Sequence, residues 1–251
     1  AKYPPWVVQK YLNRVRFVED LSLDNKETTA GLAKPRRRSF YVEVARSVHE
    51  PFYGVKHKQW SSKEVENIFH HEFAHILDAE FPFPPDDWRS CNPKGFTYGE
   101  GKPYEPEKDL WNKGFVSNYA RTEIDEDFPE LSGLILSRPR KAKLIIDNYP
   151  RLQAKYRIWL KVYQKIDSNY FSDERLFPKG LFDKKRPNKM QRTDLLEIKN
   201  THYCLYTGTK FSGRIMGNDG EYPIGSVYQN GKKISDIKFS WYPNGGKKYE
   251  V

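Results

Sequence analysis

The stretch NIFHHEFAHILDAEFPFPP, residues 67–85, constrains the fold of this chain more than any other. It belongs to a run from Ser61 to Phe81 that contains neither glycine nor proline. Ser61 and Glu64 fit a capping box, in which each side chain accepts a hydrogen bond from the other residue's backbone N–H. The prolines that follow Phe81 end the run. The sequence therefore predicts a helix of about 18–20 residues.

Two histidines lie four residues apart within this helix, with a glutamate between them. Because successive helical residues are rotated by about 100°, His71 and His75 lie about 40° apart, and Glu72 lies about 60° beyond His75. The opposite face carries apolar residues suited to packing, Phe69, Phe73 and Ile76. The helix thus presents two imidazoles and a carboxylate together, backed by a hydrophobic anchor.

This arrangement suits a zinc ion. Neutral imidazoles are zinc ligands, and a nearby carboxylate can take a proton from water that the metal activates. The five-residue pattern also arises by chance, so its context matters. Residues 39–48 predict a β-strand ahead of the helix, where an extended peptide could bind by strand addition, and residues 14–19 are a second candidate strand. We therefore predict Zn²⁺ bound by His71 and His75, with Glu72 as general base.

Two neighbours of the motif have their own interpretations. Asp78 lies one turn further along the ligand face, where it could orient a ligand histidine or be a solvated acid at the helix end. His70 points away from the ligand face and is predicted to be structural.

A catalytic zinc site needs a third protein ligand and one open position. The strongest candidate segment is FVSNYARTEIDEDFPELSG, residues 115–133. Its acidic residues could instead mark the start of a solvated helix, where they favour the helix dipole. Rival ligands stand in a loop rich in proline and glycine: Glu100, Glu105 and Glu107.

Together with HHEFAHILD, this segment resembles the gluzincin-like zinc peptidases related to the catalytic domain of anthrax lethal factor. It also resembles a family of bacterial zinc-binding metallopeptidases with an S-x-Y-A…E-D-F-A-E pattern. In that pattern a tyrosine stands seven residues before a ligand glutamate, and a second glutamate follows four residues after it. Tyr119, Glu126 and Glu130 have this spacing, and the resemblance covers about residues 1–165.

The resemblance implies a zincin-like metallopeptidase domain of the α+β class, with an active-site helix, a small mixed sheet and a helical lower part. Within it, Glu126 would complete the zinc ligands, and Tyr119 would donate a hydrogen bond to the oxyanion of the tetrahedral intermediate. Glu130 would contact one of the ligand residues and orient it, without binding the metal itself. Pro129 departs from the family pattern, because proline removes a backbone donor and disfavours helical geometry at the preceding residue. We therefore expect the helix to begin near Pro129, with Glu126 on its approach.

The surroundings of these motifs are predicted from composition and periodicity. Residues 82–115 are rich in proline, glycine and aspartate, and predict a long surface loop that walls a cleft. Two helices are predicted after it, at residues 130–137 and 150–166. The second helix carries an apolar face, formed by Leu152, Tyr156, Trp159 and Tyr163.

The sequence changes character after residue 172. Residues 173–195 are charged and basic, and predict a linker. Residues 196–251 contain short aromatic strands between glycine turns, and YQNGKK returns as YPNGGKK. An Asn-Gly turn between such strands favours a β-hairpin. This region resembles MORN-variant repeats, which implies a small antiparallel β-repeat domain that could bind a partner protein.

Composition limits the other classes. A chain of 251 residues can bury one core plus a small appendage. No apolar run approaches the roughly 20 residues of a membrane helix.

The net charge is +10, but no nucleic-acid-binding motif accompanies the basic runs, so we predict solvated linkers and helix ends at residues 34–38, 138–143 and 184–192. Cys91 and Cys204 are predicted as two unrelated buried thiols, with one bridge as the alternative.

These features predict a zinc-dependent endopeptidase that acts on peptide or protein substrates. Residues 1–172 would form the metallopeptidase domain, residues 173–195 the linker and residues 196–251 the β-repeats. One alternative is a catalytically silent zincin scaffold that binds partners through its repeat tail. A nucleic-acid-binding protein is a more distant alternative, which steeply salt-dependent binding would support. The resemblance also implies a secreted, periplasmic or cell-envelope location.

Overall fold

The computed structural model divides into two compact units, residues 1–177 and 178–251. It describes residues 2–22, 29–50, 54–99, 102–182, 195–198, 201–205, 207–210, 213–219, 222–230, 232–241 and 247–250. The chain is a mixed α/β protein with helices and small sheets, as predicted at that level. Most of the predicted linker, residues 183–194, lies outside the described residues, and the predicted division at residues 172 and 195 stays a prediction.

A small mixed sheet opens the first unit. Its four strands are β1 (Arg14–Glu19), β2 (Gly31–Lys34), β3 (Ser39–Glu50) and β4 (Gly54–Gln59). β1 and β3 confirm the two predicted strands. β3 pairs in parallel with β1 and antiparallel with β2 and β4, so it is the central strand.

The prediction that an extended peptide binds to residues 39–48 by strand addition is wrong, because β3 already pairs with β1 on one side and with β2 on the other. An extended peptide needs a strand edge with unpaired backbone groups. The order β1-β3-β2 leaves β2 at one edge among the described residues. β2 has only four residues, too few for a periodic pattern in the sequence.

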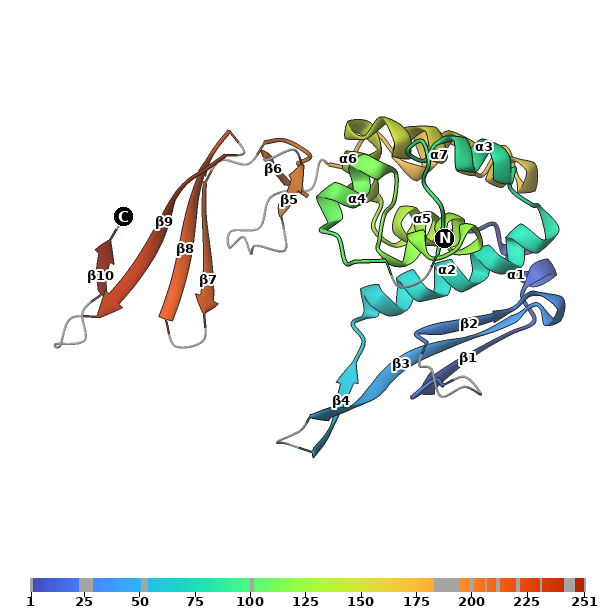
Figure 1. Ribbon diagram of the computed structural model, residues 1–251, viewed down its shortest axis with the longest axis horizontal. Helices are drawn as coiled ribbons and strands as arrows, with labels where there is room; N and C mark the ends of the chain where they lie inside the picture. The colour runs from blue at the N-terminus through green and yellow to red at the C-terminus, as the bar shows by residue number, and fades with distance from the viewer. Residues whose placement is uncertain are drawn as a thin grey trace. The chain divides into compact units, whose positions relative to one another are not determined.

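The predicted motif helix is α2 (Ser62–Glu80), and its capping box is present. The Ser61 hydroxyl accepts a bond from the Glu64 N–H at 3.3 Å, and the Glu64 carboxylate accepts one from the Ser61 N–H at 2.8 Å. Figure 1 shows α2 between the sheet and the helices that follow it. On the sheet side, the rings of Phe69 and Phe40 pack edge to face with centroids 5.1 Å apart. Packing on both sides fixes the rotation of α2, and with it the direction of its histidines.

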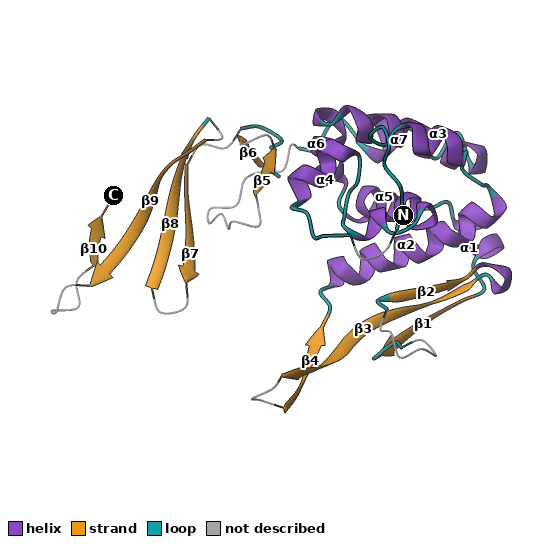
Figure 2. Ribbon diagram, in the orientation of Figure 1, coloured by secondary structure: helices purple, strands orange, loops and turns teal. Residues whose placement is uncertain are grey.

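Helices α3 to α7 cover the other side of α2 (Figure 2). The long ones are α5 (Ile124–Ser137), α6 (Pro139–Asn148) and α7 (Pro150–Ile166). The short helices of the first unit are α1 (Pro5–Tyr11), α3 (Pro85–Ser90), α4 (Glu107–Lys113) and α8 (Asp173–Leu176). The unit also contains the 3-10 turns η1 (Pro35–Arg37) and η2 (Tyr119–Arg121). α7 buries its predicted apolar face, Leu152, Tyr156, Trp159 and Tyr163.

The prediction of a surface loop over residues 82–115 is wrong. This segment holds α3 and α4 and buries the large side chains of Trp88, Leu110, Trp111 and Phe115. Pro85 is the first residue of α3, and Pro106 precedes the first residue of α4. At these positions the missing N–H of proline removes no helical hydrogen bond. Composition alone does not distinguish a proline that starts a helix from one in a loop.

The prediction that a helix begins near Pro129 is also wrong, because α5 begins at Ile124 and continues through the proline. Proline removes one backbone hydrogen bond from the helix. The buried side chains of Phe128 and Leu131 offset this loss by holding the first turns of α5 in the core. Glu126 therefore belongs to the first turn of a helix.

The second unit consists of strands and turns in the part that the structure describes. Four strands form an antiparallel sheet in the order β10-β9-β8-β7, namely β7 (Gly213–Asp219), β8 (Tyr222–Gln229), β9 (Lys232–Trp241) and β10 (Lys247–Glu250). Two more form a separate pair, β5 (Leu195–Ile198) and β6 (Thr201–Cys204). Asn230 has φ +49° between β8 and β9, as an Asn-Gly hairpin turn requires. The second predicted Asn-Gly turn, residues 244–245, lies outside the described residues.

Two further sequence predictions concern cysteines and membranes. Cys91 and Cys204 are both buried free thiols, the first of the two predicted alternatives. None of the helices in the described part of the chain has the length and apolar character that a bilayer crossing requires.

Candidate metal centre

Two helices bring three potential metal ligands together. His71 and His75 project from α2, and Glu126 projects from the first turn of α5, which packs beside α2 (Figure 1). Each side chain offers one ligand atom, and the three atoms lie within 4.8 Å of one another. The sequence predicts these three residues as the zinc ligands, and the fold places them in one cluster.

The separations of the three atoms fit a tetrahedral zinc shell. Ligands about 2.1 Å from a tetrahedral ion lie about 3.4 Å from each other. His71 Nε2 is 3.0 Å from Glu126 Oε2 and 3.2 Å from His75 Nε2. The third separation, from His75 Nε2 to Glu126 Oε2, is 3.4 Å. Two imidazoles and one carboxylate are also a ligand set that zinc adopts in catalytic sites. The residues present therefore fit the metal.

Glu130 lies one helical turn after Glu126 and contacts the other ring nitrogen of His71. Its Oε1 is 3.0 Å from His71 Nδ1, which orients the ring with Nε2 toward the cluster. Burial lowers the pKa of His71, but Glu126 and Glu130 outweigh this effect and raise it to about 10. Burial raises the pKa of Glu126, but the two histidines outweigh this effect and hold it well below its usual range. The lowered pKa of Glu126 favours the ionised carboxylate that a metal ligand must be. The raised pKa of His71 shows that the cluster stabilises positive charge, and the ring would release its extra proton on binding a metal.

Glu72 is buried beside the ligands and is held by the edge strand β2. Its Oε1 is 4.0 Å from His71 Nε2. A Cβ atom at Gly31 would lie 2.2 Å from Glu72 Oε1, so the glycine leaves the space that the carboxylate occupies. Burial raises the pKa of Glu72, and the nearby backbone of Ala33 partly opposes this rise.

Tyr119, in η2, faces the same cluster. Its ring centroid is 6.1 Å from that of His71, and the residue is 49% exposed. Partial burial and the negative charge of Glu126 raise the pKa of Tyr119 above its usual value. The hydroxyl therefore stays protonated at neutral pH and is available as a donor beside the ligands.

A polar network fixes the turn that carries Tyr119. The buried Arg121 guanidinium donates to the Glu105 carboxylate at 2.6 Å and to the Pro103 carbonyl at 2.7 Å. The Asn118 side chain accepts from the Glu105 N–H and donates to the Glu105 carbonyl. Glu105, one of the rival ligands, thus ties its own loop to the turn and lies outside the ligand cluster.

Other acidic candidates also lie outside the cluster. Asp78 accepts a hydrogen bond from the Phe83 N–H at 3.0 Å, just beyond the C-terminal end of α2. Glu107 pairs with Lys141 at 2.9 Å. Glu100 lies outside the described residues. Among the candidates that the structure describes, Glu126 is therefore the acid placed to join the two histidines.

His70 lies apart from the ligand cluster. Its ring centroid is 5.5 Å from that of Tyr3 and 5.6 Å from that of Phe69. Burial lowers the pKa of His70 to about 4, so the ring is neutral at pH 7.

Asp127 follows Glu126 on α5 but points into the helical core. Its carboxylate accepts hydrogen bonds from Lys155, from Trp88 Nε1 at 2.9 Å and from the Tyr98 hydroxyl at 2.7 Å. Burial raises the pKa of Asp127 and lowers the pKa of Lys155. This pair fastens the first turn of α5 to α7 and so positions Glu126. The sequence carries no local signal for it, because Asp127 resembles any acid at a helix start.

Comparison with known proteins bears on this region. A family model described as "Putative zinc-binding metallo-peptidase" matches residues 43–174, which include α2, η2 and α5. The chain belongs to this family. The description of this metallopeptidase family agrees with the sequence-based prediction of zinc and of peptidase activity.

One solved structure is similar to the chain. It is the crystal structure of a "putative zinc-binding metallo-peptidase" from Bacteroides caccae, with 19% sequence identity and a TM-score of 0.40. The similarity covers 66% of this chain and 61% of that chain, so the present chain spans less than two thirds of that protein. Comparison with curated proteins gave no match.

Proposed function

We propose that this member of the metallopeptidase family is a zinc-dependent endopeptidase of the gluzincin type. The observation that carries the proposal is the convergence of three ligand atoms, from two histidines of α2 and one glutamate of α5, at separations of 3.0–3.4 Å. A buried carboxylate, Glu72, and a protonated tyrosine, Tyr119, stand beside them. Family membership supports zinc binding and peptidase activity, and the roles of individual residues are part of the proposal.

Glu72 is proposed as the general base. When bound, zinc would supply Lewis acidity that polarises the substrate carbonyl and makes water nucleophilic at neutral pH. Glu72 would accept the proton of the attacking water and then deliver it to the leaving amine. Its raised pKa supports this role, because a carboxyl group whose pKa is closer to neutral both accepts and releases a proton readily.

Tyr119 is proposed to stabilise the oxyanion. Its hydroxyl lies within the electrostatic influence of Glu126, and its exposed half is open to an incoming substrate. In the reaction the hydroxyl would donate to the oxygen on which negative charge develops. The Arg121 and Asn118 network holds the turn in place for this purpose.

The edge of β2 is proposed to bind the substrate backbone. A Cβ atom at Gly31 of β2 would lie 2.2 Å from Glu72 Oε1, so this strand runs directly beside the general base. A peptide that adds as a strand to β2 would pass this carboxylate in extended form. Strand addition binds through main-chain hydrogen bonds, which suits an endopeptidase that accepts unfolded segments.

A catalytically silent zincin scaffold would retain the zinc ligands but would not require the Glu72 carboxylate. Burying a carboxylate is unfavourable unless its environment offsets the lost hydration. Glu72 is 5% exposed and its pKa is raised, so its surroundings do not fully offset the hydration that the carboxylate loses on burial. A carboxylate kept buried at such a cost favours a functional role over a structural one. In the second unit, the antiparallel strands support the proposal of MORN-variant repeats that act in recognition rather than chemistry.

Zinc analysis combined with digestion of an unbiased peptide library tests the proposal. The zinc-loaded wild-type protein is expected to hold about one zinc per chain and to cleave peptides. Glu72→Gln should keep the zinc and the fold but lose turnover, because an amide accepts no proton from water. Glu126→Ala should weaken zinc binding, and Asp78→Ala is the matched control that should not.

Two results would contradict parts of the proposal. A wild-type protein that holds zinc but cleaves no more than Glu72→Gln would favour the silent scaffold. Full zinc affinity in Glu126→Ala, together with its loss in Asp78→Ala, would transfer the ligand role to Asp78.

A further inference from the structure

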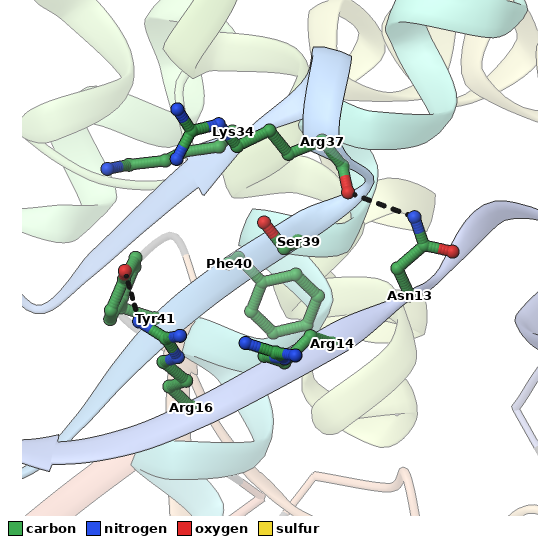
Figure 3. A pocket seen from close by; sticks show the side chains of 8 residues that line it. All are labelled: Asn13, Arg14, Arg16, Lys34, Arg37, Ser39, Phe40 and Tyr41. Carbon is green, nitrogen blue, oxygen red and sulfur yellow. Dashed lines mark hydrogen bonds between the residues drawn. The ribbon is translucent and has the colours of Figure 1, made fainter.

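α2 covers one face of the sheet, and a cavity lies on the other face. Phe40 points toward α2, where its ring packs against Phe69. Because side chains alternate along a strand, the neighbouring residues Ser39 and Tyr41 point to the opposite face. A cavity of about 280 Å³ lies there, lined by residues of β1, β2, β3 and η1. It is called the basic hollow below, and Figure 3 shows its lining.

The strand register explains why the surface is hollow at this point. Arg14 of β1 and Lys34 of β2 are both register partners of Ser39 on β3. The three residues form one row across the sheet, in which strands about 4.8 Å apart place the two cationic residues about 9.6 Å from each other. The small serine between them leaves space that a longer side chain would fill. In a neighbouring row, Arg16 is the register partner of Tyr41.

Four cationic side chains line the basic hollow: Arg14, Arg16, Lys34 and Arg37. In Figure 3, Lys34 and Arg37 lie on one side of β3, and Arg14 and Arg16 lie on the other. Arg16 donates to the Tyr41 hydroxyl at 2.8 Å, and the Lys34 ammonium lies 5.3 Å from the centre of the same ring. Tyr41 thus holds one cation from each side in place.

Within the part of the chain that the structure describes, no carboxylate pairs with the cations of the hollow. Its lining contains no acidic side chain. Among the described residues, no ion pair joins a carboxylate to any of the four cations, whereas the neighbouring Arg38 pairs with Glu80 at 3.1 Å. Like charges held together repel one another, and a bound anion relieves that repulsion. Lys34 and Arg37 belong to the basic run of residues 34–38, so part of this run lines a cavity and is not merely a solvated linker.

We propose that the basic hollow binds a small ligand that carries two phosphate groups. Arginine binds phosphate oxygens through its planar fork, and three of the four cations are arginines. A phosphate monoester carries a charge of about −1.5 to −2 at pH 7, so two of them balance four cations. The Ser39 hydroxyl and the Asn13 amide add neutral donors to the lining. The volume is close to the lower end, about 300 Å³, of small-molecule pockets, which suits a compact bisphosphate.

Calorimetric titration of fructose 1,6-bisphosphate into the zinc-loaded protein of 251 residues tests the proposal. Saturable binding of about one ligand per chain is expected, and fructose itself should not bind. Arg14→Gln and Arg16→Gln should each weaken binding about tenfold or more, because each removes charge-assisted hydrogen bonds. Arg157→Gln, which removes an exposed arginine from α7, is the matched control and should leave binding unchanged.

Two further measurements separate a pocket from diffuse attraction. Ser39→Phe keeps all four cations but fills the hollow, so it should abolish binding. Arg14→Lys keeps the positive charge but loses the planar guanidinium group, so it should also weaken binding. If Ser39→Phe does not fold, this variant still distinguishes a shaped pocket from attraction by charge alone. Tricarballylate, whose three carboxylates give a similar charge, should bind at least tenfold more weakly than the bisphosphate.

Several results would overturn the proposal. These are the absence of bisphosphate binding, equal loss of binding in Arg14→Gln and Arg157→Gln, and full binding in a folded Ser39→Phe variant. Equal affinity for tricarballylate would show attraction by charge alone and would remove the assignment to phosphate.

Discussion

Glu126 and Asp127 are neighbours on α5, yet they belong to two different kinds of charged cluster. Asp127 is 1% exposed, and its carboxylate accepts hydrogen bonds from Lys155, Trp88 and Tyr98. The Glu126 side chain is 20% exposed, and it faces two imidazoles whose Nε2 atoms lie 3.2 Å apart.

The difference between these clusters separates a structural ion pair from a candidate site. The Asp127 carboxylate meets donors only, so the protein itself satisfies it. In the Glu126 cluster, two ring nitrogens 3.2 Å apart and one carboxylate oxygen converge, and the raised pKa of His71 reflects how strongly the carboxylates stabilise positive charge there. Acceptor atoms that converge on one point are what a cation requires. The first cluster fixes α5, and the second has the ligand atoms that fit a metal ion.

Lys155→Met should have the largest effect, because it leaves the Asp127 carboxylate buried without its cation. Removal of one partner of a buried pair lowers the free energy of unfolding by about 3–5 kcal/mol. Urea denaturation followed by circular dichroism would measure this loss. Lys161→Met, at an exposed position on the same helix, is the matched control. A loss below about 1 kcal/mol would mean that Asp127 is not fixed by Lys155.

Tyr119→Phe should have the next largest effect, on the reaction rather than on the fold. Loss of one oxyanion donor raises the barrier by about 2.7–4 kcal/mol, so kcat should fall about 10²–10³-fold while the zinc content stays unchanged. Steady-state kinetics on a peptide substrate and metal analysis would measure both. Tyr104→Phe removes a hydroxyl from a residue that is 80% exposed and should change neither quantity. An unchanged rate in Tyr119→Phe would reduce the tyrosine to a packing role.

Gly31→Ala should lower activity about 10²-fold without touching a metal ligand, because its Cβ would lie 2.2 Å from Glu72 Oε1 and displace the general base. Zinc affinity should remain at the wild-type level. Gly99→Ala is the matched control, since no atom lies within 4 Å of a Cβ there. Wild-type activity in Gly31→Ala would show that the position of the Glu72 carboxylate does not limit the reaction.

Glu130→Gln should have the smallest effect of the four. It weakens the contact with His71 Nδ1, and loss of such a supporting partner typically lowers metal affinity about 10–100-fold. Competition with a chromogenic zinc chelator would measure the change. Glu66→Gln, beside His70 on the other face of α2, is the matched control. Equal zinc affinity in wild type and Glu130→Gln would make the contact incidental.

The parts of the fold that could be predicted from the sequence are those with local signals. The capping box of Ser61 and Glu64 and the unbroken run after it define α2, and alternation defines β1 and β3. The grouping of His71, His75 and Glu126 could be predicted because the spacing of two motifs resembles a known family.

The parts that could not be predicted depend on contacts between distant segments. Gly31 and Glu72 meet because β2 lies along α2, and four residues of strand give no periodic pattern. Asp127 and Lys155 meet only once α5 packs on α7. Pro129 and Pro106 misled the prediction because the cost of a proline depends on its place in a helix, which the core decides.

The two helices of the metal centre also have a thermodynamic consequence. His71 and Glu126 are 55 residues apart in the chain and are neighbours only in the folded state. Global unfolding would therefore disperse the ligands and release the ion. By mass action, each tenfold rise in free zinc above the dissociation constant adds about 1.4 kcal/mol to the free energy of unfolding. The survival of this protein among other proteases would then follow the zinc concentration around it, so zinc availability would set its lifetime as well as its rate.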